Sequence, residues 1–284
     1  MTETKLFVVE GLPGSGKTTT AVFIADWLAK QGMETAVFLE GDLNHPADFE
    51  SVAYLDRQEY EELLAHFPAH AAFLQSQAIE EGEGYFFRYR ALQQSYPDLP
   101  ELLIAALAPY EIYEQPVPTF QRLLRWRWQR FAETAAAGET IFIFECCFLQ
   151  NPLTMLLGRH DEPIPATEAF ILELAEVVRG LRPCLIYLHP GDVRATLTKI
   201  AGERPSAWLD FVIAYHTQQG HGRAQGWQGF DGLVQFYEMR QAIELALLPR
   251  LPFPHLLLPH TDWPQDQARI AAFLTQNLAF SSSG

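Results

Sequence analysis

The sequence is poor in basic residues. It contains 20 lysines and arginines against 35 aspartates and glutamates, which gives a formal net charge of −15 at pH 7. Proteins that bind the phosphate backbone of nucleic acids present clustered lysine and arginine. The composition therefore argues against a general nucleic-acid surface and is typical of an acidic cytoplasmic protein.

Cysteine is scarce as well, and no apolar run reaches the length of a membrane helix. Cys146, Cys147 and Cys184 have neither the number nor the spacing of a disulfide framework or a CxxC metal site. They lie in apolar stretches, so we expect them to be buried packing residues. A membrane helix needs about 18 consecutive apolar residues, and the first residues lack the basic and then apolar pattern of a signal peptide. We therefore expect a cytoplasmic protein that does not engage a membrane.

Apolar residues are abundant enough to form a large core. They make up 48% of the 284 residues, against 19% charged residues, and this balance is typical of folded globular proteins. Continuous apolar runs, typical of parallel strands covered on both faces, occur at residues 5–10, 35–39, 139–147, 183–188 and 253–260. The sequence thus predicts an α/β fold, in a single domain over residues 1–284, with a five-stranded parallel sheet flanked by helices.

Two long segments separate the predicted strands. Residues 44–139 lose strand character and are interrupted by proline and glycine, which predicts a long helical insertion between strands two and three. Residues 192–232 follow the fourth strand; they begin with a helix that carries basic residues and continue, at 218–232, as a glycine-rich loop. We expect a lid-like region over residues 192–232, and a homodimer formed through the insertion is a further hypothesis.

A phosphate-binding motif follows the first predicted strand. Residues 11–18, GLPGSGKT, match the P-loop (Walker A) pattern GxxxxGK[ST] in full and lie between a strand and a helix, which is the context that the motif requires. Its glycines allow a tight turn, Lys17 can reach the β- and γ-phosphates, and the Thr18 hydroxyl can ligate magnesium. The sequence therefore predicts that ATP and Mg²⁺ bind at Gly11, Gly14, Ser15, Gly16, Lys17, Thr18 and Thr19.

Four features together resemble the P-loop small-molecule kinases, a group of the P-loop containing nucleoside triphosphate hydrolase superfamily that includes thymidylate kinase and the deoxynucleoside kinases. They are the P-loop, the acidic end of strand two, Glu145 at the end of strand three, and the stretch LHPGDVRATLTKIAGER at 188–204. The resemblance implies a five-stranded parallel sheet, a lid whose basic residues close on the transferring phosphoryl group, and an adenine bordered by residues 260–263. Nucleoside kinases have an arginine after the strand-three acid, whereas this chain has Cys146, and this leaves the acceptor open.

Phosphoryl transfer needs positioning, charge neutralisation and a carboxylate that orients or deprotonates the accepting hydroxyl. Glu40 or Asp42, at the carboxyl end of strand two, is the candidate for that carboxylate, and a solvated turn or helix cap is the alternative. Glu145 has the position of the acid that holds magnesium-bound water, the alternative being a cap of the following segment. The candidate catalytic residues are Lys17, Asp42, Glu40, Glu145 and Arg204, and the candidate metal ligands are Thr18 and Glu145.

Three basic residues of the lid-like region complete the set of candidates. Arg194 and Lys199 are expected to bind the nucleotide, and Arg204 to neutralise charge on the γ-phosphoryl group. The alternative for all three is a solvated helix surface.

These features predict an ATP-dependent phosphotransferase that moves the γ-phosphoryl group to a hydroxyl of a small molecule. The acceptor would be a nucleoside, a nucleotide or an antibiotic-like compound, and the insertion at 44–139 would shape its pocket. The alternative is a partner-coupled regulatory NTPase, in which the insertion binds a protein and hydrolysis releases it. A kinase should hydrolyse ATP slowly until an acceptor is added, whereas a switch should respond to its partner.

Overall fold

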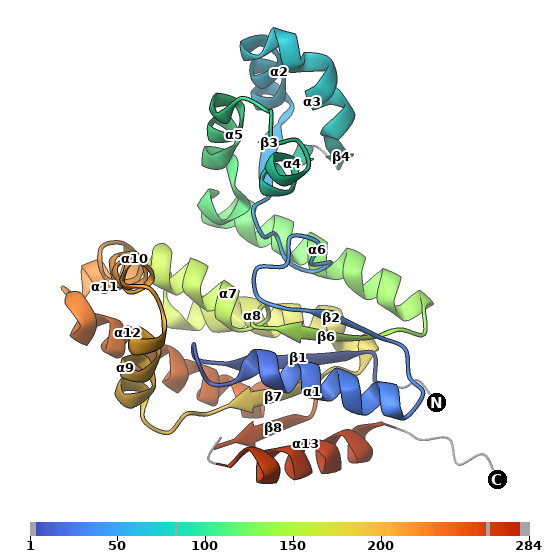
Figure 1. The fold of residues 1–284 in the computed structure, drawn as a ribbon, viewed down its shortest axis with the longest axis vertical. Coiled ribbons are helices and arrows are strands. Elements are labelled where there is room, and N and C mark those ends of the chain that lie inside the picture. Colours follow the sequence, from blue (N-terminus) through green and yellow to red (C-terminus); the bar gives the residue numbers. More distant parts are fainter. Residues whose placement is uncertain (1–3, 83, 260–261, 279–284) are drawn as a thin grey trace. The chain divides into compact units, whose positions relative to one another are not determined.

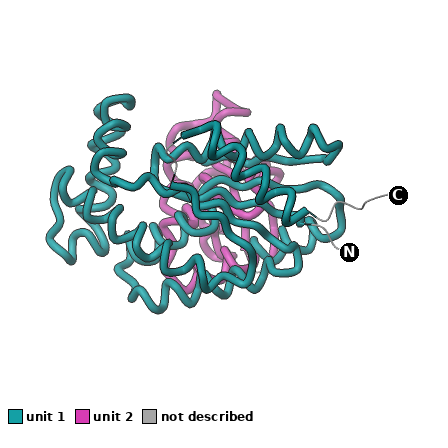
Figure 2. Tube along the Cα trace, turned by 90° about the horizontal axis from the view of Figure 1, so that it is seen from below, with its two compact units in different colours: residues 1–40, 128–284 teal, residues 41–127 magenta. Residues whose placement is uncertain are grey.

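A computed structural model of the chain describes residues 4–82, 84–259 and 262–278. The chain forms two compact units, Met1–Glu40 with Trp128–Gly284, and Gly41–Arg127 (Figure 2). The boundary between them falls inside helix α6 (Val117–Ala137). The second unit thus contains most of the predicted insertion, whereas residues 128–139 belong to the first unit.

The first unit is built on a five-stranded parallel sheet (Figure 1). Its spatial order is β2-β6-β1-β7-β8, and every neighbouring pair is parallel. The strands are β1 (Leu6–Gly11), β2 (Thr35–Phe38), β6 (Ile141–Glu145), β7 (Cys184–Leu188) and β8 (His255–Leu258). All five predicted strands and the α/β fold class with a parallel sheet are confirmed.

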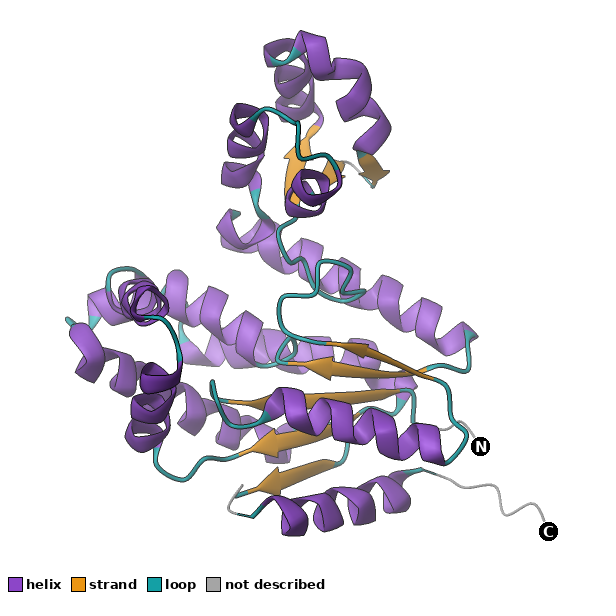
Figure 3. Ribbon diagram, in the orientation of Figure 1, coloured by secondary structure: helices purple, strands orange, loops and turns teal. Residues whose placement is uncertain are grey.

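Helices flank this sheet (Figure 3). α1 and α13 pack on one face, where Ile24 and Leu274 join a core that includes Val9 of β1. On the other face, Phe131 of α6 packs edge-on against Phe142 of β6. The helices of the first unit besides α6 are α1 (Lys17–Lys30), α7 (Gln150–Pro152), α8 (Ile164–Val178), α9 (Val193–Glu203), α10 (Ser206–Thr217), α11 (Gly220–Ala224), α12 (Gly229–Leu247) and α13 (Trp263–Asn277), with a π-helical turn at Leu153–Arg159.

A separate apolar cluster fixes three helices beside the P-loop. Leu12 of the loop, Leu197 of α9, Val212 of α10 and Leu233 of α12 are all buried in it. Because the loop contributes a residue to this cluster, packing of α9, α10 and α12 is coupled to the position of the loop. These helices form one wall of the site described below.

The glycine-rich segment at 218–232 differs from the predicted loop. Residues Gly220–Ala224 form α11, and α12 already begins at Gly229. A Cβ atom at Gly222 would lie 1.9 Å from the carbonyl oxygen of His216, and one at Gly220 would lie 2.1 Å from that of Gly158. The prediction of a loop is therefore wrong for α11 and the start of α12, because the glycines allow close backbone packing rather than a turn.

The second unit is not purely helical. Its centre is a three-stranded antiparallel sheet of order β3-β5-β4, which the sequence analysis did not predict. The strands are β3 (Ala53–Asp56), β4 (Ile79–Glu81) and β5 (Gly84–Phe87), and the helices are α2 (Arg57–His66), α3 (Ala71–Gln77), α4 (Tyr89–Ser95), α5 (Glu101–Leu107) and the first part of α6. The helices and the sheet enclose a core of their own, which includes Leu55, Phe87 and Leu103.

Two further expectations concern burial and membranes. Cys146, Cys147 and Cys184 are buried thiols, as expected for packing residues. Among the described residues, no helix has both the length and the apolar content needed to cross a membrane.

Candidate active site

The P-loop connects the end of β1 to the start of α1, and its glycines have conformations that other residues avoid. Gly14 and Gly16 have φ angles of 73° and 90°. A Cβ atom at Gly11 would lie 2.6 Å from the backbone oxygen of Leu188 in the neighbouring strand. Gly16 also precedes the first turn of α1, so the free N–H groups of a 14-residue helix face the loop. The loop therefore has the backbone geometry of an anion site.

Lys17 and Thr18 occupy the positions that the motif assigns to them. Lys17 is buried, and its Nζ donates a hydrogen bond to the carbonyl oxygen of Leu12 at 3.3 Å. The Thr18 hydroxyl donates to both carboxylate oxygens of Glu145, at 2.9 and 3.1 Å. This contact exists because β6 lies beside β1, with Glu145 paired to Val9. In a typical nucleotide-bound Mg²⁺ site the protein supplies one or two oxygen ligands, such as a hydroxyl and a carboxylate, and the other ligands are phosphates and water.

A chain of polar contacts extends from Glu145 to α12. The backbone N–H of Glu40 donates to Glu145 at 3.4 Å, and the Glu40 carboxylate accepts from Gln150 Nε2 at 2.8 Å. The Arg240 guanidinium donates through Nη2 to Gln150 Oε1 at 3.4 Å and to the Gly11 carbonyl at 3.2 Å. Arg240 is buried, and its Nε lies 3.1 Å from Oε1 of the equally buried Glu244. The carbonyl oxygen of Gly11, the first residue of the P-loop, thus accepts a hydrogen bond from a residue 229 positions away in the sequence.

Glu10, the residue before the P-loop, holds the segment that follows β6. Its fully buried carboxylate accepts hydrogen bonds from the N–H groups of Phe148 and Leu149, both at 2.8 Å, and of Gln150 at 3.3 Å. Burial raises the pKa of Glu10 from 4.5 to about 7; the negative charge of Glu244 also raises it, while the N–H donors lower it. Glu10 therefore positions Gln150 and with it the polar chain.

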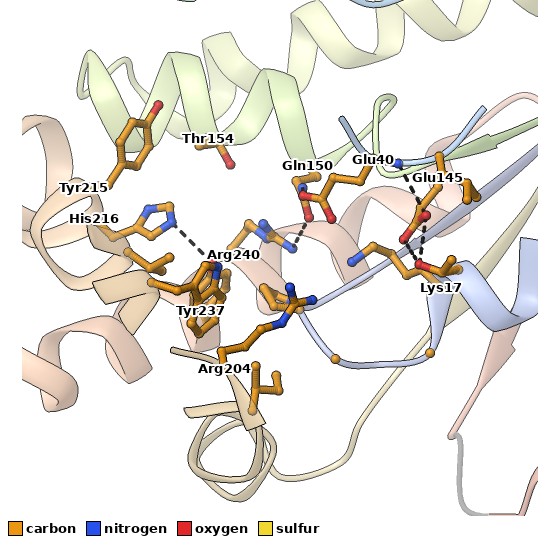
Figure 4. Close-up of a pocket in the computed structure, with 18 of the residues that line it drawn as sticks. Lys17, Glu40, Glu145, Gln150, Thr154, Arg204, Tyr215, His216, Tyr237 and Arg240 are labelled. Atoms are coloured by element: carbon orange, nitrogen blue, oxygen red, sulfur yellow. Dashed lines mark hydrogen bonds between the residues drawn. The ribbon is translucent and has the colours of Figure 1, made fainter. Parts of the chain in front are cut away.

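A cavity of about 710 Å³ opens over the P-loop (Figure 4). One end is lined by loop and strand-end residues, among them Lys17, Thr18, Thr19, Glu40 and Glu145. The other end, where Figure 4 shows Tyr215, His216 and Tyr237, is lined mainly by α10 and α12. The ring of Phe211, 5.9 Å from that of Tyr215, and the ring of Trp208 also line the cavity. In Figure 4 the charged ends of Lys17, Arg204 and Arg240 point into the space between the two ends.

The three basic lid candidates differ in position. Arg204 lines the cavity, with its guanidinium 5.8 Å from the centre of the Trp208 ring. Arg194 is exposed and forms a 2.8 Å ion pair with Asp231 of α12. Lys199 is exposed on α9, one residue before Ile200, which lines the cavity. The structure therefore brings Arg204 to the site and directs Arg194 toward another partner.

The remaining predicted site residues are placed as follows. Ser15 is buried in the loop. Asp42 belongs to the second unit, where its carboxylate accepts a hydrogen bond from the N–H of Asn44 at 2.8 Å, which is a local turn. Of the segment expected to border adenine, residues 260 and 261 lie outside the described residues; Trp263 begins α13 and packs edge-on against Phe23, with ring centroids 5.7 Å apart.

Sequence reasoning missed the residues that α10 and α12 contribute. Arg240 and Glu244 are four residues apart in the sequence, a spacing that allows an ion pair on a helix, and this pair was the available signal. The sequence contains no signal for Gln150 or for the aromatic residues, because only the packed fold brings them to the P-loop.

No family model matches the chain, and no curated protein matches it either. The assignment of a function therefore depends on the geometry of the site.

Proposed function

We propose that this chain is a P-loop kinase that uses ATP and Mg²⁺ to phosphorylate a hydroxyl group of a small molecule. The observation that carries the proposal is a continuous cavity whose lining includes both the P-loop and the aromatic residues of α10 and α12. An NTPase that only hydrolyses its nucleotide needs room for a water molecule beside the γ-phosphate, whereas a kinase needs a second compartment of the size of an organic molecule.

The residues of the loop end fit a nucleotide and a metal ion. The N–H groups of the loop and of the start of α1 would hold the phosphates, and Lys17 would contact the β- and γ-phosphates. Thr18 and Glu145 would hold Mg²⁺, directly or through water. When bound, Mg²⁺ neutralises part of the charge of the triphosphate.

The other charged groups would act on the transfer itself. Glu40 would orient or deprotonate the accepting hydroxyl, since it lines the cavity and is held by Gln150; Asp42 is the alternative. Arg204 would neutralise charge on the transferred group. Arg194 and Lys199 are not among the residues found to line the cavity, so their contribution to nucleotide binding stays a prediction.

The test is phosphoryl transfer from γ-labelled ATP. Purified protein with Mg²⁺ is incubated with pools of nucleosides, nucleotides, aminoglycosides, nucleoside antibiotics and a metabolite extract, and label is followed into new species. We expect label in a small molecule with the native chain and with Lys30→Ala, an exposed lysine on the same helix, but not with Lys17→Ala. Label that appears only as free phosphate with every pool would refute the kinase and favour a partner-coupled NTPase.

A further inference from the structure

The two ends of the cavity differ in chemistry. The loop end presents backbone N–H groups and charged side chains, whereas the far end is a wall of aromatic rings. Figure 4 shows Tyr215, His216 and Tyr237 on the side of Arg240 that faces away from Lys17. Two of these rings are fixed by their neighbours, because His216 stacks on Phe236 at 4.0 Å and its Nε2 lies 3.3 Å from the Tyr237 hydroxyl. His216 and Tyr237 therefore form a fixed part of the wall.

The aromatic end adjoins the part of the loop where a terminal phosphate would lie. In a P-loop the lysine reaches the β- and γ-phosphates, and here Lys17 Nζ is held 3.3 Å from the carbonyl oxygen of Leu12. The preceding carbonyl, of Gly11, accepts from Arg240, which separates the two ends of the cavity. A molecule against the aromatic wall would thus lie beyond the γ-phosphate, in the position of an acceptor rather than of the nucleobase.

The charges of the aromatic end are compensated. Burial, together with the positive charge of Arg240, lowers the pKa of His216 to about 3, so its ring is neutral at pH 7. Burial raises the pKa of Tyr237 to about 12, so its hydroxyl keeps its proton. Arg240 itself is paired with Glu244. Beside His216, Tyr237 and Arg240 a charged acceptor would therefore lose hydration without gaining an ionic partner. The charged residues at the end of α9 that also line the cavity are Glu203 and Arg204, and in the proposed function Arg204 faces the transferred phosphoryl group.

A hydroxyl group faces this end as well. Thr154, on the π-helical turn, directs its side chain into the cavity (Figure 4). Within the part of the chain that the structure describes, the Thr154 hydroxyl has no hydrogen-bond partner. It can therefore bind a polar group of an acceptor that stacks on the rings.

We infer that the aromatic end holds the phosphoryl acceptor, and that the acceptor is an uncharged molecule with a planar ring and a free hydroxyl group. This inference rests on the proposed kinase function. It separates the acceptor classes that the sequence left open, since it disfavours nucleoside monophosphates, which are anions, and aminoglycosides, which are polycations without a planar ring. Transfer would form a bond from the acceptor oxygen to the γ-phosphorus and release ADP, with the hydroxyl proton passing to a base such as Glu40.

The test combines binding and transfer. Equilibrium dialysis with a non-hydrolysable ATP analogue and Mg²⁺ measures the Kd of three probe sets: nucleosides and neutral aryl glycosides, nucleoside monophosphates, and kanamycin. Phe211→Ala is the test variant, because its ring lines the cavity and is 65% exposed, so its loss should not unfold the chain. Val22→Ala, also exposed and on α1, is the matched control. We expect a neutral ring compound to bind, with Kd raised about tenfold by Phe211→Ala and unchanged by Val22→Ala.

The outcomes separate this inference from the kinase proposal. Label transferred to a monophosphate or to kanamycin, with no effect of Phe211→Ala, would overturn the inference and leave the kinase intact. Binding of none of the neutral ring compounds would also overturn it. A neutral ring compound that binds in a Phe211-dependent way but never accepts label would support the ligand class and refute the kinase.

Discussion

Glu145 ends β6 at the point where its carboxylate meets the hydroxyl of Thr18. If the pair holds Mg²⁺, removal of the negative charge should weaken the metal site while the hydrogen bond to the hydroxyl can persist. We expect Glu145→Gln to lower Mg²⁺-dependent ATP turnover by roughly 10- to 100-fold and to raise the Mg²⁺ concentration needed for half-maximal rate. Steady-state rates over a Mg²⁺ titration check this. Glu139→Gln, an exposed acid just before the same strand, is the control, and equal behaviour of the two variants would contradict the assignment.

Glu10 makes the stability of the fold depend on pH. Its pKa in the folded chain, about 7, lies above the ordinary value of 4.5 because the carboxyl group is buried. A raised pKa means that the folded state binds the proton of Glu10 more tightly than the unfolded state does. Protonation of Glu10 therefore stabilises the fold in full below pH 4.5, and this stabilisation is lost as pH rises through 7. The difference in unfolding free energy between the native chain and Glu10→Gln should fall by about 3 kcal/mol between pH 4.5 and pH 8.

Urea unfolding of both proteins at several pH values measures this difference. The other groups that face Glu10, Glu244 and Lys17, are common to both chains, so their titration largely cancels in the difference. A difference that does not change with pH would show that the Glu10 carboxyl titrates normally.

At the scale of elements, the strands of the large sheet could be predicted because each is a continuous apolar run in a parallel sheet. β3, β4 and β5 were missed because they are short and are not continuous apolar runs, since β3 ends in Asp56, β4 contains two glutamates and β5 begins with Gly84. In addition, β3 pairs with β5 across α2 and α3. The P-loop was visible because its chemistry is local in sequence. The place of Arg240 and of the aromatic wall beside the loop was not visible, because packing of α10 and α12 brings them there. The spacing of Arg240 and Glu244 indicates only that the two can form an ion pair.

α11 depends on a close backbone approach that only glycine permits. A methyl group at Gly222 would overlap the backbone oxygen of His216, which cannot move without shifting α10. We expect Gly222→Ala to lower the free energy of unfolding by about 2 kcal/mol. Gly202→Ala in α9, where a Cβ meets nothing within 4 Å, should instead raise it by up to about 1 kcal/mol. Thermal unfolding of both variants and of the native chain measures these changes. A Gly222→Ala variant as stable as the native chain would show that α10 and α11 are less closely packed.

At the scale of the whole molecule, all residues found to line the cavity belong to the first unit. That unit alone brings together the P-loop, the metal candidates and the aromatic wall. The role of residues 44–139 in shaping an acceptor pocket stays a prediction. What the second unit does have is a core of its own, enclosed by its antiparallel sheet and four complete helices.

This separate core predicts that residues 41–127 fold alone. A unit with its own buried cluster does not need the rest of the chain to hide its apolar surface. The isolated fragment should therefore unfold cooperatively on heating, followed by circular dichroism, and Leu103→Ala, which removes a fully buried side chain from the cluster, should destabilise the fragment by about 2 to 5 kcal/mol. Leu102→Ala, whose side chain is 76% exposed, should leave the transition nearly unchanged. A fragment that loses its signal gradually, without a transition, would mean that this core is stable only within the full chain.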